Sequence, residues 1–189
     1  MTYIRNHTLP FGTVHIVSDG SAITRLYTGA AEETVSCAVI DTCIRQLDEY
    51  IAGSRREFDL PAAPKGTDFQ RSVWAALCTI PCGQTRTYGE IAAQLGRPKA
   101  ARAVGGACNK NSILLLIPCH RVVGSDGSLT GFAAGLEVKQ QLLELERMTA
   151  DGRPQGPPCK PYHRNRPCPC PPAITKKEND DEQLPHRTG

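Results

Sequence analysis

The chain has 189 residues, 40% of them hydrophobic, and a formal net charge of +3. This length suits one medium domain or two small ones, and no apolar run is long enough to cross a membrane. The start carries no export signal, so we expect a cytoplasmic protein without a membrane partner, or a nuclear one if the organism is eukaryotic. The nine cysteines are odd in number, and in a reducing compartment most should be free thiols.

Charge is distributed unevenly along the chain. Residues 1–64 carry five Lys/Arg against eight Asp/Glu, residues 65–149 ten against six, and residues 151–189 seven against five. Between 84 and 121 there are six basic residues and a single acid, Glu90. A basic segment behind an acidic one is typical of a face that binds a polyanion, although a solvated surface explains the charge alone equally well.

The first third of the chain predicts a small α/β unit. Strands at 13–17 and 22–27 flank an Asp-Gly pair at 19–20, which is a strong hairpin signal. Apolar residues then recur at helical spacing up to a stop at Gly53. These residues are Ile40, Ile44, Leu47 and Ile51. The prolines and the glycine of 54–66 predict a linker.

Two capping boxes predict helix starts in the next part of the chain. The first, Thr67 to Gln70, opens a helix whose buried face includes Phe69 and Leu77. The second, Thr87 to Glu90, opens a short helix that stops at Gly96.

A third helix is expected from Lys99 to about Cys108, with Pro98 as its first residue. Two short helices joined by a tight glycine-containing turn are a candidate helix-turn-helix. From Ala100 to Ala107 this helix consists of small residues and one valine, apart from Arg102. Because a Gly-Gly pair is a poor helix former, we expect its backbone to approach something bulky, with Arg102 projecting beyond its neighbours.

The remaining segments predict a loop, a helix and a tail. A glycine-containing loop at 124–135 suits the wall of a pocket, and a last helix is expected from about Glu137 to Arg147. Residues 150–189 hold nine of the fifteen prolines, so we predict a disordered tail. No metal site is predicted, because the metal-ligand types in the tail match no familiar zinc spacing. They are Cys159, His163, Cys168 and Cys170.

The segment from Leu116 to Val123 carries the strongest chemical signal in the sequence. Cys119 follows an apolar run and precedes a histidine and an arginine, His120 and Arg121. A free cysteine titrates near ~8.5, so a neighbouring base or cation is needed to make it nucleophilic at neutral pH. The alternative is that Cys119 simply ends a buried strand.

A thiol that must reach a base inside a DNA duplex needs that base extruded. From Tyr50 to Glu146 the sequence resembles the 6-O-alkylguanine-DNA alkyltransferases, also called methylated-DNA–protein-cysteine methyltransferases. The matching stretches are Phe69 to Trp74, Thr87 to Ala92, Pro98 to Gly106, Asn111, Pro118 to Val123, and Gly135 to Glu146. The first 50 residues match this family only in outline.

The resemblance implies a set of catalytic residues. Cys119 is the implied alkyl acceptor, His120 a base that acts through a water, and Glu146 the group that orients His120. Tyr88 is implied to help rotate the nucleotide and to donate a hydrogen bond to the extruded guanine. Asn111 is implied to bridge the helix-turn-helix and the active-site segment. Taken singly, each of these side chains has an ordinary structural explanation.

The resemblance also implies a DNA-contacting surface. Arg102 is expected to fill the vacated place in the base stack, while the small-residue helix with Ala101 and Gly105 enters the minor groove. Tyr88 and Arg121 are also expected to contact DNA.

The implied substrate pocket consists of Val122, Phe132, Ala133 and Ala134. The backbone at Cys119 and Val122 is expected to read the edge of the base. Phe132 stands where the family frequently has tyrosine, and Ala134 where it has glycine, so the accepted range of alkyl groups is in question.

Together these features predict an α/β (α+β) N-terminal domain at 1–64, a mainly helical alkyltransferase domain with a helix-turn-helix at 65–149, and the tail. The predicted function is DNA repair by irreversible, single-turnover transfer of an alkyl group from 6-O-alkylguanine to the protein, with 4-O-alkylthymine as a further candidate substrate. The expected partner is double-stranded DNA with an alkylated guanine, bound by a monomer without a cofactor. The alternatives are a non-enzymatic sensor of alkylated DNA and an unrelated thiol enzyme.

Some members of this family hold a structural zinc in the N-terminal part. No such set of ligands can be matched onto the residues available here, which are His7, His15, Cys37 and Cys43.

Overall fold

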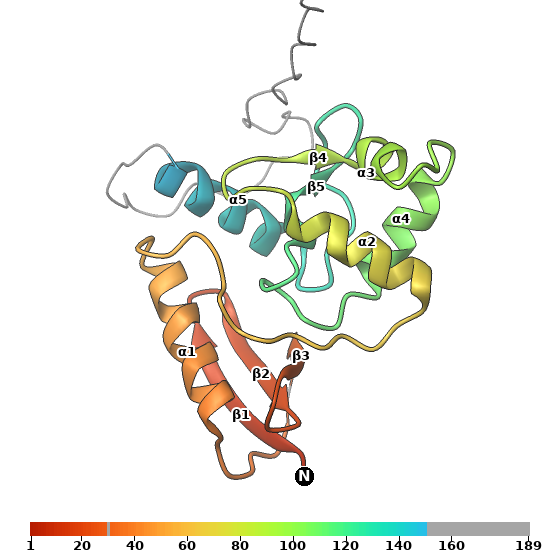
Figure 1. Cartoon of the computed structure of the whole chain (residues 1–189). Coiled ribbons are helices and arrows are strands. Elements are labelled where there is room, and N and C mark those ends of the chain that lie inside the picture. Colours follow the sequence, from red (N-terminus) through yellow and green to blue (C-terminus); the bar gives the residue numbers. More distant parts are fainter. Residues whose placement is uncertain (30, 151–189) are drawn as a thin grey trace, which may run out of the picture.

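The computed structural model describes residues 1–29 and 31–150, and Figure 1 shows how its elements are arranged. A small N-terminal part that contains a sheet is followed by a mainly helical C-terminal part, which confirms the coarse fold prediction. Apart from residue 150, the predicted tail lies outside the described residues, and so do its cysteines and histidine.

The N-terminal part is a three-stranded antiparallel sheet with one helix packed beside it (Figure 1). The strands are β1 (Tyr3–Leu9), β2 (Gly12–Ser18) and β3 (Ile23–Thr28), in that order across the sheet. Helix α1 (Ala38–Ile51) packs against β1 and β2. The predicted hairpin is confirmed, and Asp19 Oδ1 stabilises its turn by accepting the backbone N–H groups of residues 21 and 22.

Strand β1 does not follow from the sequence pattern. Its central residues Arg5, Asn6 and His7 are polar and half-buried, so the alternation that marks a strand with one buried face is weak. The strand forms because β2 offers a full ladder, from Tyr3 opposite Ser18 onward.

The C-terminal part surrounds a short parallel pair of strands with helices (Figure 1). Its elements are α2 (Asp68–Cys78), β4 (Arg86–Thr87), α3 (Tyr88–Gln94), α4 (Ala101–Asn109), the 3₁₀ turn η1 (Cys119–Arg121), β5 (Val122–Val123) and α5 (Leu136–Ala150). Both predicted capping boxes, at Thr67 and Thr87, are present with reciprocal hydrogen bonds. They fix where α2 and α3 begin.

The prediction that Pro98 begins a helix is wrong. Pro98 and Lys99 lie in a turn closed by a hydrogen bond from Ala100 N to Arg97 O (2.8 Å), and α4 begins only at Ala101. The fixed φ of proline suits this turn as well as a first helical position, so the residue type alone does not decide between them.

The two parts are joined through strand β3. Leu26 N donates to Ser112 O (2.8 Å) and Leu114 N donates to Leu26 O (2.9 Å), which ties the segment before Cys119 to the N-terminal sheet. One apolar core includes residues of both parts, among them Leu26 and Ile113. The segment that carries the cysteine is therefore anchored at the junction of the two parts.

Candidate active site

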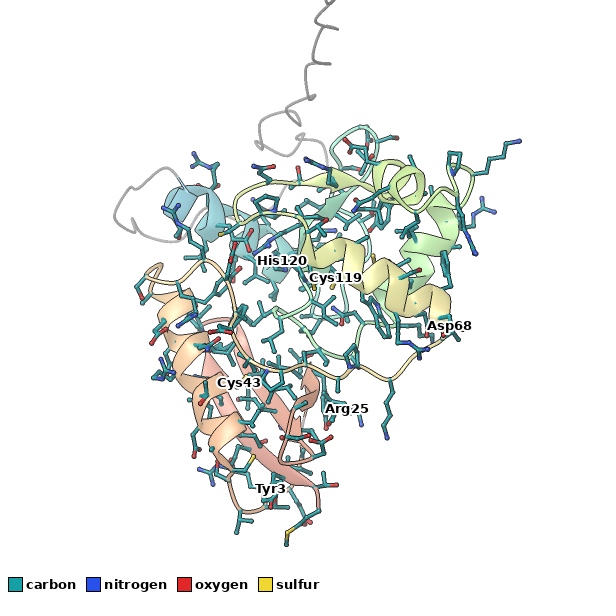
Figure 2. All side chains as sticks on the ribbon, viewed as in Figure 1. Tyr3, Arg25, Cys43, Asp68, Cys119 and His120 are labelled. Carbon is teal, nitrogen blue, oxygen red and sulfur yellow. The ribbon has the colours of Figure 1, made fainter. Side chains whose placement is uncertain are left out.

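Cys119 lies buried at the start of η1, with 4% of its surface exposed. Figure 2 shows it next to His120 in the interior of the C-terminal part. The Nδ2 of Asn111 donates to Cys119 Sγ (3.1 Å) and to Ile117 O (2.9 Å), while its Oδ1 accepts from Ile113 N (3.0 Å). Asn111 therefore holds both the thiol and the chain that leads to it.

The Cys119 thiol is protonated in the resting protein. Burial raises its pKa above the ordinary value, and the hydrogen bond from Asn111 and the charge of Lys139 offset only part of this effect. Burial without a base makes a cysteine inert. The thiol consequently needs a proton acceptor before it can act as a nucleophile.

His120, the next residue, is the candidate acceptor, at one of its two ring nitrogens. Its Nε2 lies 2.8 Å from Glu146 Oε1, and both side chains are fully buried. Burial lowers the pKa of His120, although the neighbouring carboxylate opposes this shift. An ionised carboxylate can only accept, so Nε2 carries the proton of the neutral ring. Nδ1 is then the unprotonated atom, and it has no hydrogen-bond partner among the described residues.

Glu146, on α5, accepts hydrogen bonds from four groups. The donors are Tyr50 Oη (2.6 Å), His120 Nε2 (2.8 Å), Arg121 Nη2 (2.8 Å) and Gly83 N (3.1 Å). Burial raises the pKa of Glu146, but the charges and hydrogen bonds of His120 and Arg121 outweigh this and hold the pKa well below its ordinary value. The carboxylate is thus ionised and saturated with donors.

The surroundings of Arg121 do not favour the expectation that its side chain contacts DNA, which stays a prediction. Its side chain is only 8% exposed, its Nε and Nη2 bind Glu146, and its Nη1 donates to Ile80 O (2.6 Å). These hydrogen bonds turn the guanidinium toward Glu146 and Ile80. The basic character of the segment suggested that the Arg121 side chain is exposed. It is buried instead because it pairs with the carboxylate of Glu146, 25 residues later.

Tyr88, the first residue of α3, lies beside α4. It is half-buried, and its hydroxyl donates to Thr130 O (3.3 Å). A Cβ placed on Gly105 would lie 3.8 Å from the Tyr88 ring, so this glycine of α4 faces the tyrosine. Ala101 is half-buried on the same helix, and Arg102 is exposed to solvent.

The predicted pocket residues differ in their surroundings. Val122 is buried in β5, and Phe132 presents its ring to the His120 ring at 6.3 Å and 77°. Ala134 packs against the core, while Ala133 is exposed. The structure thus brings Phe132 and Val122 to the catalytic segment and leaves Ala133 at the surface.

Three residues at the site were missed by the sequence patterns. Tyr50 and the N–H of Gly83 bind Glu146, and Lys139 donates from its buried Nζ to the carbonyls of Val122 (2.5 Å) and Thr130 (2.8 Å). Tyr50 and Lys139 lie on helices where a tyrosine or a lysine is unremarkable, and Gly83 acts through its backbone. No local signal distinguishes them.

The N-terminal candidates for a metal do not form a site. His7 Nε2 binds Asp48 Oδ1 (2.7 Å), His15 binds Asn6, and Cys43 lies fully buried in the apolar core. Within residues 1–29 and 31–150, no three histidine, cysteine or acidic side chains are grouped to hold a metal ion. The same residues include no helix that is long and apolar enough to cross a membrane.

A buried thiol that precedes the histidine of an imidazole–carboxylate pair is typical of proteins with a base-assisted cysteine nucleophile. Two family models match it: "6-O-methylguanine DNA methyltransferase, ribonuclease-like domain" over residues 3–64 and "6-O-methylguanine DNA methyltransferase, DNA binding domain" over residues 68–148. The chain belongs to the 6-O-methylguanine DNA methyltransferase family.

Individual relatives agree with this family. A Methanosarcina barkeri protein named methylated-DNA–protein-cysteine methyltransferase is 62% identical over 102 residues, which are 54% of this chain and 65% of that protein. A Mycobacterium tuberculosis protein of the same name is 43% identical over 157 residues, covering 79% of this chain and 95% of the relative. The matched part thus spans slightly less than two thirds of the Methanosarcina protein.

Solved structures show the same fold. The crystal structure of Mycobacterium tuberculosis O6-methylguanine methyltransferase aligns with a TM-score of 0.73 at 43% identity, covering 79% of this chain and 94% of that one. A structure of the mycobacterial protein in complex with DNA aligns with a TM-score of 0.72 at 44% identity, covering 77% and 93%.

Proposed function

We propose that this protein repairs DNA by transferring the alkyl group of 6-O-alkylguanine irreversibly to the sulfur of Cys119. The observation that carries the proposal is the buried His120–Glu146 pair beside the Cys119 thiol. Support also comes from the family, whose Mycobacterium tuberculosis member has been crystallised with DNA. The 4-O-alkyl group of thymine offers the same kind of carbon and is a further candidate substrate.

The reaction is a single displacement. His120 Nδ1 accepts the thiol proton through a water, and Glu146 stabilises the resulting imidazolium. The thiolate attacks the alkyl carbon, an S–C bond forms, and the bond from that carbon to O6 of guanine breaks. A neutral guanine leaves more readily than its anion, so the Tyr88 hydroxyl donates a proton to the departing guanine. The His120 imidazolium then returns a proton to Tyr88, and both side chains are neutral again.

The protein is consumed by this reaction. The product is a thioether, which is chemically stable. Each molecule therefore acts once. Because the alkyl group comes from DNA, the transfer requires no cofactor, and we expect a cytoplasmic or nuclear monomer to carry it out.

The proposed DNA contact uses α3 and α4 as a helix-turn-helix. Exposure of Arg102, Ala103 and Gly106 supports this role, because a helix face with few side chains can enter the minor groove. Arg102 is the long side chain on that face, so it is placed to fill the gap left by an extruded base. Tyr88 lies next to Gly105 of α4, and its proposed role is to help rotate the nucleotide.

The test is transfer from duplex DNA that carries a labelled 6-O-methylguanine. We expect each protein molecule to gain one methyl group, located by peptide mass on Cys119, and the Cys119→Ser variant to gain none. Multiple turnovers or label on another cysteine would overturn the assignment. A protein that binds this DNA without gaining mass would be a sensor of alkylated DNA instead.

A further inference from the structure

Tyr50 comes from the N-terminal part, yet its hydroxyl lies in the catalytic network. The residue is near the end of α1, is 2% exposed, and packs its ring against Phe58 at 5.2 Å. Its Oη lies 2.6 Å from Glu146 Oε1 and 3.5 Å from His120 Nε2. A side chain 96 positions from Glu146 thus contacts both Glu146 and His120.

The hydroxyl of Tyr50 is a permanent donor. Burial and the neighbouring Glu146 carboxylate raise the pKa of Tyr50 well above its ordinary value, so the phenol keeps its proton. Glu146 is ionised and can only accept. The short distance is typical of a charge-assisted hydrogen bond, which is among the stronger kinds in proteins.

Tyr50 and His120 donate to the same oxygen atom. A carboxylate offers about four lone-pair sites. Here Oε1 accepts from Tyr50, His120 and Arg121 Nη2, and Oε2 accepts from Gly83 N and Arg121 Nε. Each donor reduces the negative charge that the others experience. The Tyr50 hydrogen bond therefore both aims Oε1 at the imidazole and limits how strongly this oxygen favours the imidazolium.

We propose that Tyr50 is a positioning residue for the alkyl transfer, through which the N-terminal part of the chain fixes the Glu146 carboxylate on His120. The inference rests on the proposed function. A second contact supports it: Arg56 Nη2, in the linker, donates to Thr149 O (2.7 Å) on the same helix as Glu146. The N-terminal part thus binds α5 at Glu146 and at Thr149 O, which lie about one helical turn apart. Only the contact at Glu146 involves the catalytic carboxylate.

The groups that set the charge at this point come from several elements. They are Tyr50 on α1, Cys82 after α2, His120 and Arg121 in η1, and Lys139 and Glu146 on α5, with Arg56 and Glu57 of the linker acting on Cys82. Among these residues, only Tyr50 can lose its hydrogen-bond donor through the removal of a single oxygen atom, and this removal leaves the charge unchanged. Tyr50→Phe is therefore the cleanest variant.

The experiment measures single-turnover methyl transfer from duplex DNA between pH 5 and pH 9. Without the hydroxyl, Glu146 favours the His120 imidazolium more strongly, so the neutral base is lost at higher pH. In Tyr50→Phe we expect the acid limb of the rate profile to move upward by about half a unit or more, and the rate at neutral pH to fall about 3- to 10-fold. The final yield should stay near one methyl group per protein.

Two controls separate positioning from stability. Tyr3→Phe removes a hydroxyl at the far end of the N-terminal part from His120 (Figure 2), and its rate profile should match the wild type. Arg56→Met removes the hydrogen bond from Arg56 to Thr149 O of α5 (2.7 Å). At about 0.15 M salt this variant should lower the melting temperature and leave the acid limb of the pH–rate profile unchanged. A Tyr50→Phe profile that superimposes on the wild type would overturn the inference, whatever happens to stability.

A second substitution keeps the test decisive if Tyr50→Phe folds poorly. Incorporation of 3-fluorotyrosine at position 50 retains the hydroxyl and makes it a stronger donor, so the acid limb should move downward. An upward or absent shift would contradict the inference. Failure of the wild-type protein to accept any methyl group would instead refute the proposed function, and the two failures are therefore distinguishable.

Discussion

Arg121 and Glu146 form a buried ion pair at the centre of the site. Arg121 Nε lies 3.0 Å from Oε2 and Nη2 lies 2.8 Å from Oε1, and the two side chains are 8% and 0% exposed. A buried carboxylate without a cation is strongly disfavoured. The arginine that follows His120 in sequence therefore keeps the orienting carboxylate ionised.

Replacing Arg121 by methionine should destabilise the fold without weakening DNA binding through phosphates. Breaking one partner of a buried pair costs about 3–5 kcal/mol, so the urea midpoint should fall strongly. The slope of DNA affinity against salt should stay that of the wild type, because no phosphate contact is lost. A shallower slope for Arg121→Met would show that this arginine contacts DNA after all.

Stability should decrease as the pH falls below 6.5. The pKa of His120 is lowered by burial, so below its ordinary value of 6.5 the unfolded chain binds a proton that the folded protein does not. The loss continues down to the folded pKa, at about 1.4 kcal/mol for each unit between the two values. The contribution of Glu146, whose pKa is also lowered, is retained down to its ordinary value of 4.5 and is lost only below it.

This dependence can be measured by urea unfolding at pH 7.5 and pH 5.0. We expect the wild type to lose stability between these values and a His120→Asn variant to lose less. Equal losses in the two proteins would mean that other groups, and not His120, produce the pH dependence.

Asn111→Ala should make the Cys119 thiol less reactive. The variant removes the side-chain hydrogen bond that Asn111 donates to Sγ, and it leaves Ile113 N without the acceptor that lies 3.0 Å away. The thiol pKa should rise further, and stability should fall by about 1–3 kcal/mol. The rate of iodoacetamide labelling on the Cys119 peptide, followed against pH, reports the first effect.

A neighbouring asparagine provides the matched control. Asn109 is exposed at the end of α4, so Asn109→Ala should leave the labelling rate at Cys119 unchanged. If both variants slowed labelling alike, the effect would come from α4 as a whole and not from the hydrogen bond to sulfur.

Arg102→Ala should impair repair of duplex DNA far more than reaction with free 6-O-methylguanine. In its proposed role the exposed arginine acts only when a base has left the stack, and the cost of unstacking is a few kcal/mol, or about 10- to 100-fold in rate. Arg25→Ala removes an exposed arginine of β3, which lies over the Tyr27 ring, and should affect neither substrate. Equal losses of Arg102→Ala on both substrates would refute the role.

Local patterns predicted much of the fold because the interactions behind them are local. The capping boxes at Thr67 and Thr87 join residues three apart, and the hairpin at Asp19 is closed by its own turn. Where a local pattern is shared by two structures, it misleads. Pro98 suits a turn as well as a helix start, and the turn forms. β1 lacks a pattern of its own and depends on its pairing with β2.

The sequence by itself predicted Cys119 and His120 as the candidate reactive residues, because the motif that points to them, Pro118 to Val123, is local and can be read without knowledge of the fold. The tertiary structure alone decided what makes them work. Donors from positions 50, 83, 120 and 121 converge on the carboxylate of Glu146, and no spacing along the chain records that meeting. The tertiary structure also determined that Arg121 is buried, because a cation is buried only where a buried carboxylate offsets the loss of its hydration.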